Sequence, residues 1–288
     1  MSTFKQFLAG KGLARSSVRS YSYSVGIFTE WLKAERITDI TYSQLLNFIR
    51  ARRSAGESRG LIASRLTAIR WFLRWQKHEG IRATNPAEGL YLKGRKRRLP
   101  HDLLEAEQLE QLYQKYPTET IIDQRNKTML GLLVWQGITT GELARLEPAH
   151  LDLEKGTVRM LPTKQSNSRT LELKPFQVLE LYRYQLEVRP KLLDERTTEN
   201  PKLFISTGSS AKLQNTLQIL SNQLKKEHSF FAGFPQIRAS VIANWLKTNP
   251  LRQVQYWVGH KYVSSTERYL LGGLEGLKQS VEKFHPLR

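Results

Sequence analysis

The 288-residue sequence predicts a mainly α-helical protein with two domains: a small helical N-terminal domain, and a mixed, mostly helical second domain that contains a small antiparallel β-sheet. Three observations predict this fold class. Apolar residues recur three or four positions apart along most of the chain, short alternating runs concentrate in one region of the second half, and a basic segment ending in proline interrupts both patterns. We therefore expect domains at residues 1–92 and 101–288, joined by a linker at residues 93–100.

The N-terminal domain is expected to be a helical bundle, because helical apolar spacing covers most of it. Thr41 and Asn85 are predicted helix N-caps, and Pro86 suits the first helical position after Asn85. Several arginines are expected to project from the non-core side of these helices and to offer a cationic face to phosphate oxygens. They are Arg50, Arg53, Arg59, Arg65 and Arg74.

The second domain should be helical on both sides of a small sheet. Residues 151–173 contain alternating runs around Lys155-Gly156 and around a polar stretch at 164–168, which predicts an antiparallel sheet. KLFIS at 202–206 is interpreted as one further strand. Helical spacing predicts the remaining elements, at residues 109–113, 129–135, 175–188 and from about 214 onward.

Charge favours a nucleic acid as the partner. The formal net charge is +19, and residues 1–100 hold 20 Lys and Arg against 6 Asp and Glu. A membrane surface also attracts basic proteins, but the excess lacks the concentrated apolar face that membrane-binding helices need. The sequence contains no cysteine, no apolar run long enough to span a bilayer and no signal peptide, so we expect a cytoplasmic, nucleoid-associated protein of bacterial type.

The C-terminal run FPQIRASVIANWLKTNPLRQVQYWVGHKYVSSTERYLLG carries the most specific pattern in the chain. It contains Arg238, a Gly259-His260 pair and, nine residues after His260, Tyr269. This run resembles the tyrosine recombinases, the phage integrase family. The resemblance covers about residues 4–270: LARSSVRSYSYSVGIFTEWL looks like the family's core-binding domain, and QGITTGELARLEPAHLDLEKGTVRM is similar to the block with its first catalytic arginine.

The resemblance implies a role for each matched residue. Tyr269 would attack the phosphodiester and become linked to the DNA 3′-phosphate, which stores the bond energy without ATP, metal or another cofactor. Arg238 would stabilise the charged transition state. Lys164 would protonate the leaving 5′-oxygen, with Lys155 and Arg169 as alternatives near the same hairpin, and His260 would bind the phosphate or assist proton transfer. The basic linker would cross the DNA backbone through Lys93, Arg95, Lys96, Arg97 and Arg98.

Two residues depart from the family pattern. Thr139 stands where the first catalytic arginine is expected, and Pro235 replaces the histidine of the His-x-x-Arg pair. Proline neither exchanges a proton nor donates from its nitrogen, and is better explained as a helix-starting residue. The candidates to replace the missing arginine are Arg125, Arg145, Arg159 and Arg169, of which Arg169 is the least constrained by helix geometry.

Three functions remain open on these residues. The first is a site-specific recombinase or integrase, as found on mobile genetic elements, with a degenerate active site. The second is a catalytically impaired DNA-binding accessory protein that leaves cleavage to another recombinase. A type IB topoisomerase is disfavoured by the helical N-terminal domain. By resemblance the protein would act as a tetramer on two DNA sites, and its tail would either dock on a neighbouring protomer or pack on its own domain.

Overall fold

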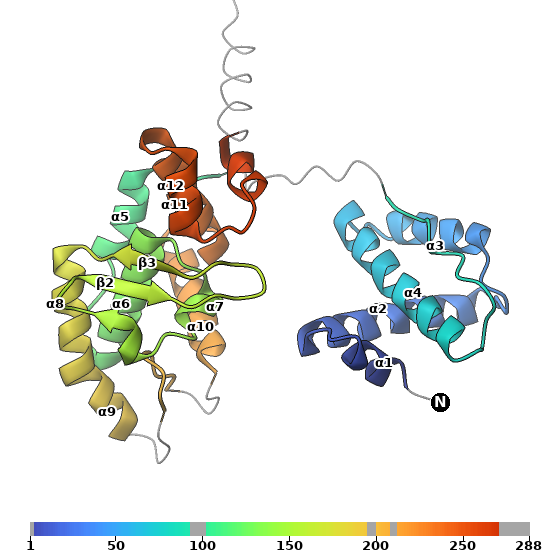
Figure 1. The fold of residues 1–288 in the computed structure, drawn as a ribbon, viewed down its shortest axis with the longest axis horizontal. Coiled ribbons are helices and arrows are strands. Elements are labelled where there is room, and N and C mark those ends of the chain that lie inside the picture. The colour runs from blue at the N-terminus through green and yellow to red at the C-terminus, as the bar shows by residue number, and fades with distance from the viewer. Residues whose placement is uncertain (1–2, 93–101, 195–199, 208–211, 271–288) are drawn as a thin grey trace, which may run out of the picture. The chain divides into compact units, whose positions relative to one another are not determined.

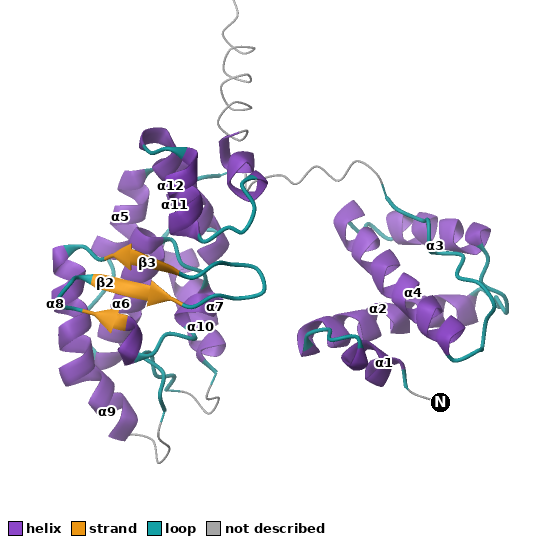
Figure 2. Cartoon of the chain, in the orientation of Figure 1, coloured by secondary structure: helices purple, strands orange, loops and turns teal. Residues whose placement is uncertain are grey.

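The structure, a computed structural model, describes residues 3–92, 102–194, 200–207 and 212–270 (Figure 1). The chain divides into two compact units, Met1–Arg97 and Arg98–Arg288. Helices dominate both units, and the described strands all lie in the second unit (Figure 2). The predicted fold class, mainly α with one small antiparallel sheet, is confirmed.

The first unit is a helical bundle built on two long helices. Helices α2 and α4 pack along each other, and α1 and α3 both contact α4. Phe28 of α2, Phe48 of α3 and Leu66 of α4 are buried in the shared core. Aromatic rings join these helices, since Phe28 and Phe48 meet edge to face at 5.1 Å. The described helices are α1 (Phe4–Gly10), α2 (Arg15–Ala34), α3 (Tyr42–Ser54) and α4 (Arg59–His78).

One predicted cap of this unit is confirmed and the other is wrong. Thr41 caps α3, accepting a hydrogen bond from the Gln44 backbone N–H. Asn85 caps only a turn: its Oδ1 accepts from the Ala87 N–H at 3.0 Å, but residues 86–89 form turns instead of a helix. The Arg70 guanidinium donates hydrogen bonds to the carbonyls of Ala87 and Leu90. These carbonyls therefore have donors even though no helix follows to supply backbone N–H groups.

The predicted arginine face needs one correction. Arg50, Arg53 and Arg59 are exposed. Arg65, however, is buried, and its guanidinium donates two hydrogen bonds of 2.7 and 2.8 Å to the Glu57 carboxylate. The helical pattern places Arg65 beside core positions, and a buried guanidinium is stable there because an acidic partner neutralises it. The expectation that Arg65 projects from the non-core side is wrong.

Helix α6 is the central element of the second unit. It is buried on nearly every side, with Met129, Leu130, Leu132 and Leu133 almost fully covered. Helices α5, α8 and α11 pack around it. The helices of this unit are α5 (Ala106–Gln114), α6 (Ile121–Gln136), α7 (Thr140–Leu143), η1 (Pro148–His150), α8 (Pro175–Arg183), the π-helical η2 (Tyr184–Val188), α9 (Arg189–Asp194), α10 (Leu213–Glu227), α11 (Phe234–Thr248) and α12 (Leu251–Val258). Residues 264–270 are also helical.

The sheet lies where the alternating runs predicted it. Strands β1 (Leu151–Asp152), β2 (Thr157–Met160) and β3 (Arg169–Glu172) pair antiparallel in sequence order. Alternation places Val158, Met160 and Leu171 in the core. The loop between β2 and β3, residues 161–168, projects beyond the sheet (Figure 1).

KLFIS at 202–206 is not a strand, which corrects the prediction. Its residues 203–205 are buried, but its backbone bonds to other groups: Leu203 N–H donates to the Leu146 carbonyl at 2.8 Å, and the Ile205 carbonyl accepts from Arg125. A buried apolar run satisfies its backbone by any available partner, and here these partners are a loop carbonyl and an arginine.

Some predictions fall on residues outside the described ranges. These are the linker residues Lys93, Arg95, Lys96, Arg97 and Arg98, and the tail beyond residue 270. Among the described helices, none combines the length and the apolar character required to cross a bilayer.

Candidate active site

Helix α11 presents Arg238 one turn from its start. Gly233, at φ 152°, precedes the helix, and Pro235 lies in its first turn, where a missing N–H costs no helical hydrogen bond. Pro235 is therefore a helix-starting residue, as its sequence context predicted. Arg238 follows on the same helix, largely buried, with 16% of its side chain exposed.

The Arg238 guanidinium is held by the ends of two other helices. It donates to the carbonyl of Gly137, where α6 ends, and at 3.0 Å to the carbonyl of Val258, the last residue of α12. A third contact is the Glu142 carboxylate at 3.8 Å. Burial lowers the pKa of Arg238, and the negative charge of Glu142 opposes this change. Arg238 is thus a fixed, positively charged group.

Glu142 and Arg169 form a buried ion pair beside Arg238. Arg169 Nη1 lies 2.7 Å from Glu142 Oε1, and both side chains are almost completely covered. Burial opposes ionisation of Glu142, but the hydrogen bond and charge of Arg169 outweigh it, so the pKa of this carboxyl is lowered. The pair is ionised, and it couples strand β3 to helix α7.

Thr139 acts as a helix cap at this position. Its Oγ1 accepts from the Glu142 backbone N–H at 3.1 Å, while its own N–H and hydroxyl donate to Glu142 Oε2 at 2.8 and 2.9 Å. This reciprocal arrangement is a capping box at the start of α7. Thr139 therefore orients Glu142 without contributing a positive charge.

Three consecutive carbonyls at the end of α12, which we call the carbonyl row, each accept a hydrogen bond from a different element. Arg169 Nε on β3 donates to the Trp257 carbonyl at 2.6 Å, and Arg238 on α11 donates to the next one. The N–H of Asn167, in the β2–β3 loop, donates to the Gly259 carbonyl at 2.9 Å. Helix ends leave such carbonyls without internal partners. The row thus fixes the turn that leads to His260.

Gly259 is required by this turn. It ends α12 in the left-handed conformation at φ 76°. A Cβ at this position would lie 2.5 Å from Arg169 Nη1. Both the backbone conformation and the space therefore demand glycine.

His260 follows directly and is kept neutral. Its Nδ1 lies 2.9 Å from the Thr266 hydroxyl, and its backbone bridges to Ser166 in the β2–β3 loop. Burial, followed by the positive charges of Arg238 and Arg268, lowers the pKa of His260 to about 4. At neutral pH the imidazole is an uncharged hydrogen-bonding group.

Tyr269 lies beside His260 on the helical segment 264–270. The two rings stack with centroids 6.2 Å apart and planes 20° from parallel. Tyr269 also packs against the small apolar cluster of Ile242, Val254 and Val258. It is only partly buried, so the predicted nucleophile remains reachable from solvent.

Lys164 lies at the exposed tip of the loop that contacts His260. Thr163 Oγ1 accepts from the backbone N–H groups of Gln165 and Ser166 at 3.0 and 2.9 Å, which shapes a tight turn around Lys164. Lys164 itself is exposed. Loop residues Ser166 and Asn167 meet the Gly259-His260 turn, and this contact places the lysine loop next to the site.

Comparison with known proteins identifies the chain. The model named "Phage integrase family" matches residues 102–271, and the model named "Phage integrase, N-terminal SAM-like domain" matches residues 2–80. The chain belongs to the phage integrase family. Among curated relatives of this family member, a tyrosine recombinase XerC of Anoxybacillus flavithermus is 25% identical over 90% of this chain and 88% of its own. A tyrosine recombinase XerD of Vibrio cholerae is 28% identical over 96% and 92%.

Solved structures share the fold at lower identity. A XerH site-specific recombinase bound to its difH substrate has a TM-score of 0.72 at 18% identity, covering 93% of this chain and 82% of its own. A lambda integrase tetramer bound to a Holliday junction has a TM-score of 0.62 at 15% identity, covering 92% and 74%. The arrangement of helices around a small sheet is therefore the family's fold.

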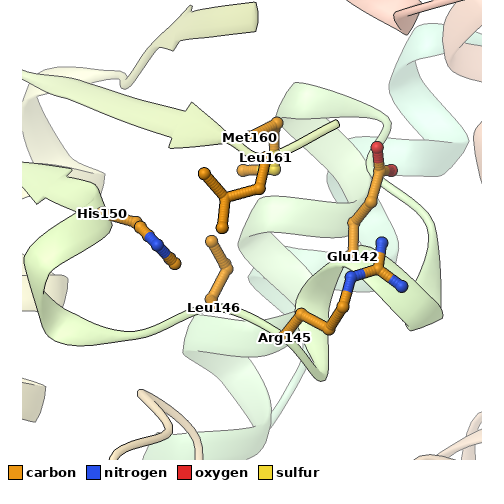
Figure 3. Close-up of a pocket in the computed structure, with 6 residues that line it drawn as sticks. All are labelled: Glu142, Arg145, Leu146, His150, Met160 and Leu161. Atoms are coloured by element: carbon orange, nitrogen blue, oxygen red, sulfur yellow. The ribbon is translucent and has the colours of Figure 1, made fainter. Parts of the chain in front are cut away.

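In this phage integrase family member, the four arginines considered as replacements for the missing one have other environments. Arg125 is buried and donates to the Asn126 side chain and the Ile205 carbonyl. Arg169 is committed to Glu142 and the carbonyl row. Arg159 is exposed on β2. Arg145 lines a small pocket, as Figure 3 shows; the other lining residues are Glu142, Leu146, His150, Met160 and Leu161.

Two residues of the site were missed by the sequence reasoning. Glu142 lies three positions after Thr139, the spacing of a capping box, and this spacing was a usable signal. Arg268 directly precedes Tyr269, and its guanidinium lies over the Tyr269 ring, 5.3 Å from the centroid. The only sequence signal for Arg268 was its place next to the predicted nucleophile. This signal is weak, because the position of a residue in the sequence does not determine where a long side chain lies.

Proposed function

We propose that this protein is a site-specific DNA recombinase that cleaves and rejoins DNA through Tyr269, with an active site that is degenerate at Thr139 and Pro235. The observation that carries the proposal is the grouping of Tyr269, His260 and Arg238 around the end of α12. The XerC and XerD names of its relatives support the reaction class.

The chemistry follows from these groups. The Tyr269 hydroxyl oxygen attacks the scissile phosphorus, the bond from phosphorus to the 5′-oxygen breaks, and a 3′-phosphotyrosyl bond forms. The hydroxyl proton leaves to solvent, and the 5′-oxygen takes a proton from Lys164. The phosphate keeps one negative charge, and reversal by another 5′-hydroxyl rejoins the strand. Arg238 stabilises the extra charge of the transition state, and the neutral imidazole of His260 hydrogen-bonds the phosphate.

The degenerate positions reduce the charge available to this reaction. Removal of one oxyanion donor typically slows a reaction about 10²- to 10³-fold unless another group replaces it. Neither Thr139 nor Pro235 supplies a charge, and Thr139 is occupied in capping α7. Cleavage should therefore be slow unless another cation of the site takes the place of the missing arginine.

The partner in this proposal is double-stranded DNA, bound by a protein tetramer on paired sites. The first unit offers the exposed residues Arg50, Arg53 and Arg59, together with Arg74, whose side chain is 45% exposed, to the phosphate backbone. The basic linker adds further cations. The name of the lambda integrase tetramer on a Holliday junction supports the assembly.

Covalent trapping tests the proposal. Duplexes bound by the full chain are selected from a random-sequence pool, and the recovered site is prepared with a nick one or two nucleotides from each candidate cleavage position. Cleavage then releases a fragment of one or two nucleotides, and its 5′-hydroxyl diffuses away before it can rejoin the strand. The covalent protein–DNA adduct should therefore accumulate and be visible on a denaturing gel. Tyr269→Phe should abolish the adduct, and Tyr262→Phe, at a tyrosine with 72% exposure, should not. Bound wild-type protein without adduct would contradict strand cleavage.

A second function is favoured by Thr139 and Pro235 themselves. The protein would occupy recombination sites as an accessory subunit and leave cleavage to another recombinase. A mixture with a XerC- or XerD-type recombinase of the same cell would then recombine paired sites, and Tyr269→Phe in this chain would have no effect. Recombination by the purified chain alone would eliminate this function.

A further inference from the structure

Arg268 is an arginine without an assigned partner at the centre of the site. Within the described residues, the Arg268 side chain makes no hydrogen bond and no ion pair with a carboxylate, and its Nε is buried away from solvent. A buried N–H group without an acceptor destabilises the folded protein. Such a group is stable in a binding site whose ligand completes it.

The position of Arg268 is defined by its neighbours. Its guanidinium lies 5.3 Å from the Tyr269 ring centroid, and the same ring stacks with His260, with the two ring centroids 6.2 Å apart. Its positive charge contributes to lowering the pKa of both His260 and Arg238. Arg268 therefore lies close to all three groups that were assigned to the phosphate.

The positive charge available to the non-bridging oxygens is incomplete without Arg268, because Lys164 was assigned to the leaving 5′-oxygen. Arg169 and Arg238 carry two positive charges, of which the Glu142 carboxylate neutralises one, and His260 is neutral. A phosphodiester under attack by a phenolate carries about two negative charges at its non-bridging oxygens. Arg169 has no exposed side-chain surface, so it cannot meet this charge by contact. Arg268, a partly exposed cation beside Tyr269, would supply the second positive charge.

We propose that Arg268 donates hydrogen bonds from its guanidinium to a non-bridging oxygen of the scissile phosphate and thereby replaces the arginine that is missing at Thr139. This inference rests on strand cleavage by Tyr269. The side chain already lies against the ring whose hydroxyl attacks, so rotation about its own torsions brings it to an oxygen bonded to that phosphorus. Arg268 is then a catalytic residue, together with Arg238.

Single-turnover cleavage of the nicked duplex tests the proposal at saturating protein. Arg268→Ala should slow adduct formation about 10²- to 10³-fold while DNA affinity changes little. The rate of Arg268→Lys should lie between the rates of the wild type and of Arg268→Ala, because lysine keeps the positive charge but lacks the paired donors of a guanidinium. Arg252→Ala, at an exposed arginine of α12, is the matched control and should cleave at the wild-type rate.

Two further measurements separate a catalytic from a structural role. Thr139→Arg, introduced into Arg268→Ala, should recover at least about tenfold in rate, because it returns a guanidinium to the same phosphate. A methylphosphonate at the scissile position removes one negative charge, and the defect of Arg268→Ala should shrink there. If Arg268→Ala slowed cleavage only by disturbing the structure, neither Thr139→Arg nor the methylphosphonate would reduce the rate defect.

The outcomes are distinguishable. Wild-type cleavage together with an unimpaired Arg268→Ala variant would overturn the role of Arg268 and leave the recombinase function standing. A defect that neither Thr139→Arg nor methylphosphonate relieves would also overturn it. Failure of the bound wild-type chain to form any adduct would overturn both proposals.

Discussion

Thr139 has a structural role at the position where the family resemblance predicts a catalytic arginine. Its hydroxyl and backbone close the capping box with Glu142, and loss of an N-cap side chain typically costs about 0.5 to 2 kcal/mol. Thr139→Arg therefore adds a positive charge to the site but removes the cap that stabilises α7. The Thr139→Arg variant should be judged on rate relative to folded protein, with its unfolding midpoint measured in parallel.

His260 gives the stability of the protein a defined pH dependence. In the unfolded chain its pKa is near 6.5, whereas burial and nearby arginines lower it to about 4 in the folded chain. Between these values the unfolded state binds the extra proton, so the contribution of His260 to stability is present above pH 6.5 and is lost as pH falls toward 4.

Urea unfolding at pH 7, 5.5 and 4.5 measures this effect. The wild-type midpoint should fall more over this range than the midpoint of His260→Gln, which cannot take up the proton. If the urea midpoints of the two proteins fall equally, the pKa of His260 does not differ between the folded and unfolded states.

At the scale of elements, the β2–β3 loop and the end of α12 act as one unit. The Asn167 N–H donates to the Gly259 carbonyl, and Ser166 pairs with His260. These backbone contacts hold the loop that carries the exposed Lys164 next to the Gly259-His260 turn.

Asn167→Pro should therefore slow cleavage without weakening DNA binding. Proline removes the N–H that reaches Gly259, and loss of one hydrogen bond of about 1 kcal/mol corresponds to roughly a fivefold slower step. Asn167→Ala retains the N–H and should cleave normally. If both variants cleave at the wild-type rate, the loop contact does not position Lys164.

The sequence predicted the elements whose signals are local. Periodicity located the longer helices and the small antiparallel sheet, and the side-chain oxygen of Thr41 predicted a cap. Prediction from the sequence failed where a residue's structure depends on a partner that the local pattern does not reveal. KLFIS became an irregular segment because Arg125 and Leu146 supply its hydrogen bonds, and Arg65 became buried because Glu57 neutralises it. For the same reason the sequence did not show that Arg169, one of four arginines considered as replacements for the missing one, is paired with Glu142.

At the scale of the whole molecule, DNA affinity should depend steeply on salt. Each phosphate neutralised by an arginine releases counterions, and the slope of log Kobs against log salt is about −0.9 per contact. Replacement of Arg50, Arg53, Arg59 and Arg74 by Gln should reduce this slope by up to about 3.6.

Arg65→Gln provides the contrast. Arg65 is buried against Glu57, so this variant should lower the melting temperature and leave the salt slope of the folded protein unchanged. A slope that is unaltered in the quadruple variant would place the DNA on another surface.

The carbonyl row has a consequence for how the site assembles. Strand β3, helix α11 and the β2–β3 loop each satisfy one of three successive acceptors. Withdrawal of any one element leaves a buried acceptor without a donor and loosens the turn on which the others depend. Contacts that share a backbone segment in this way are not additive. The site should therefore form or dissolve cooperatively, as a switch with two states and few partially active intermediates.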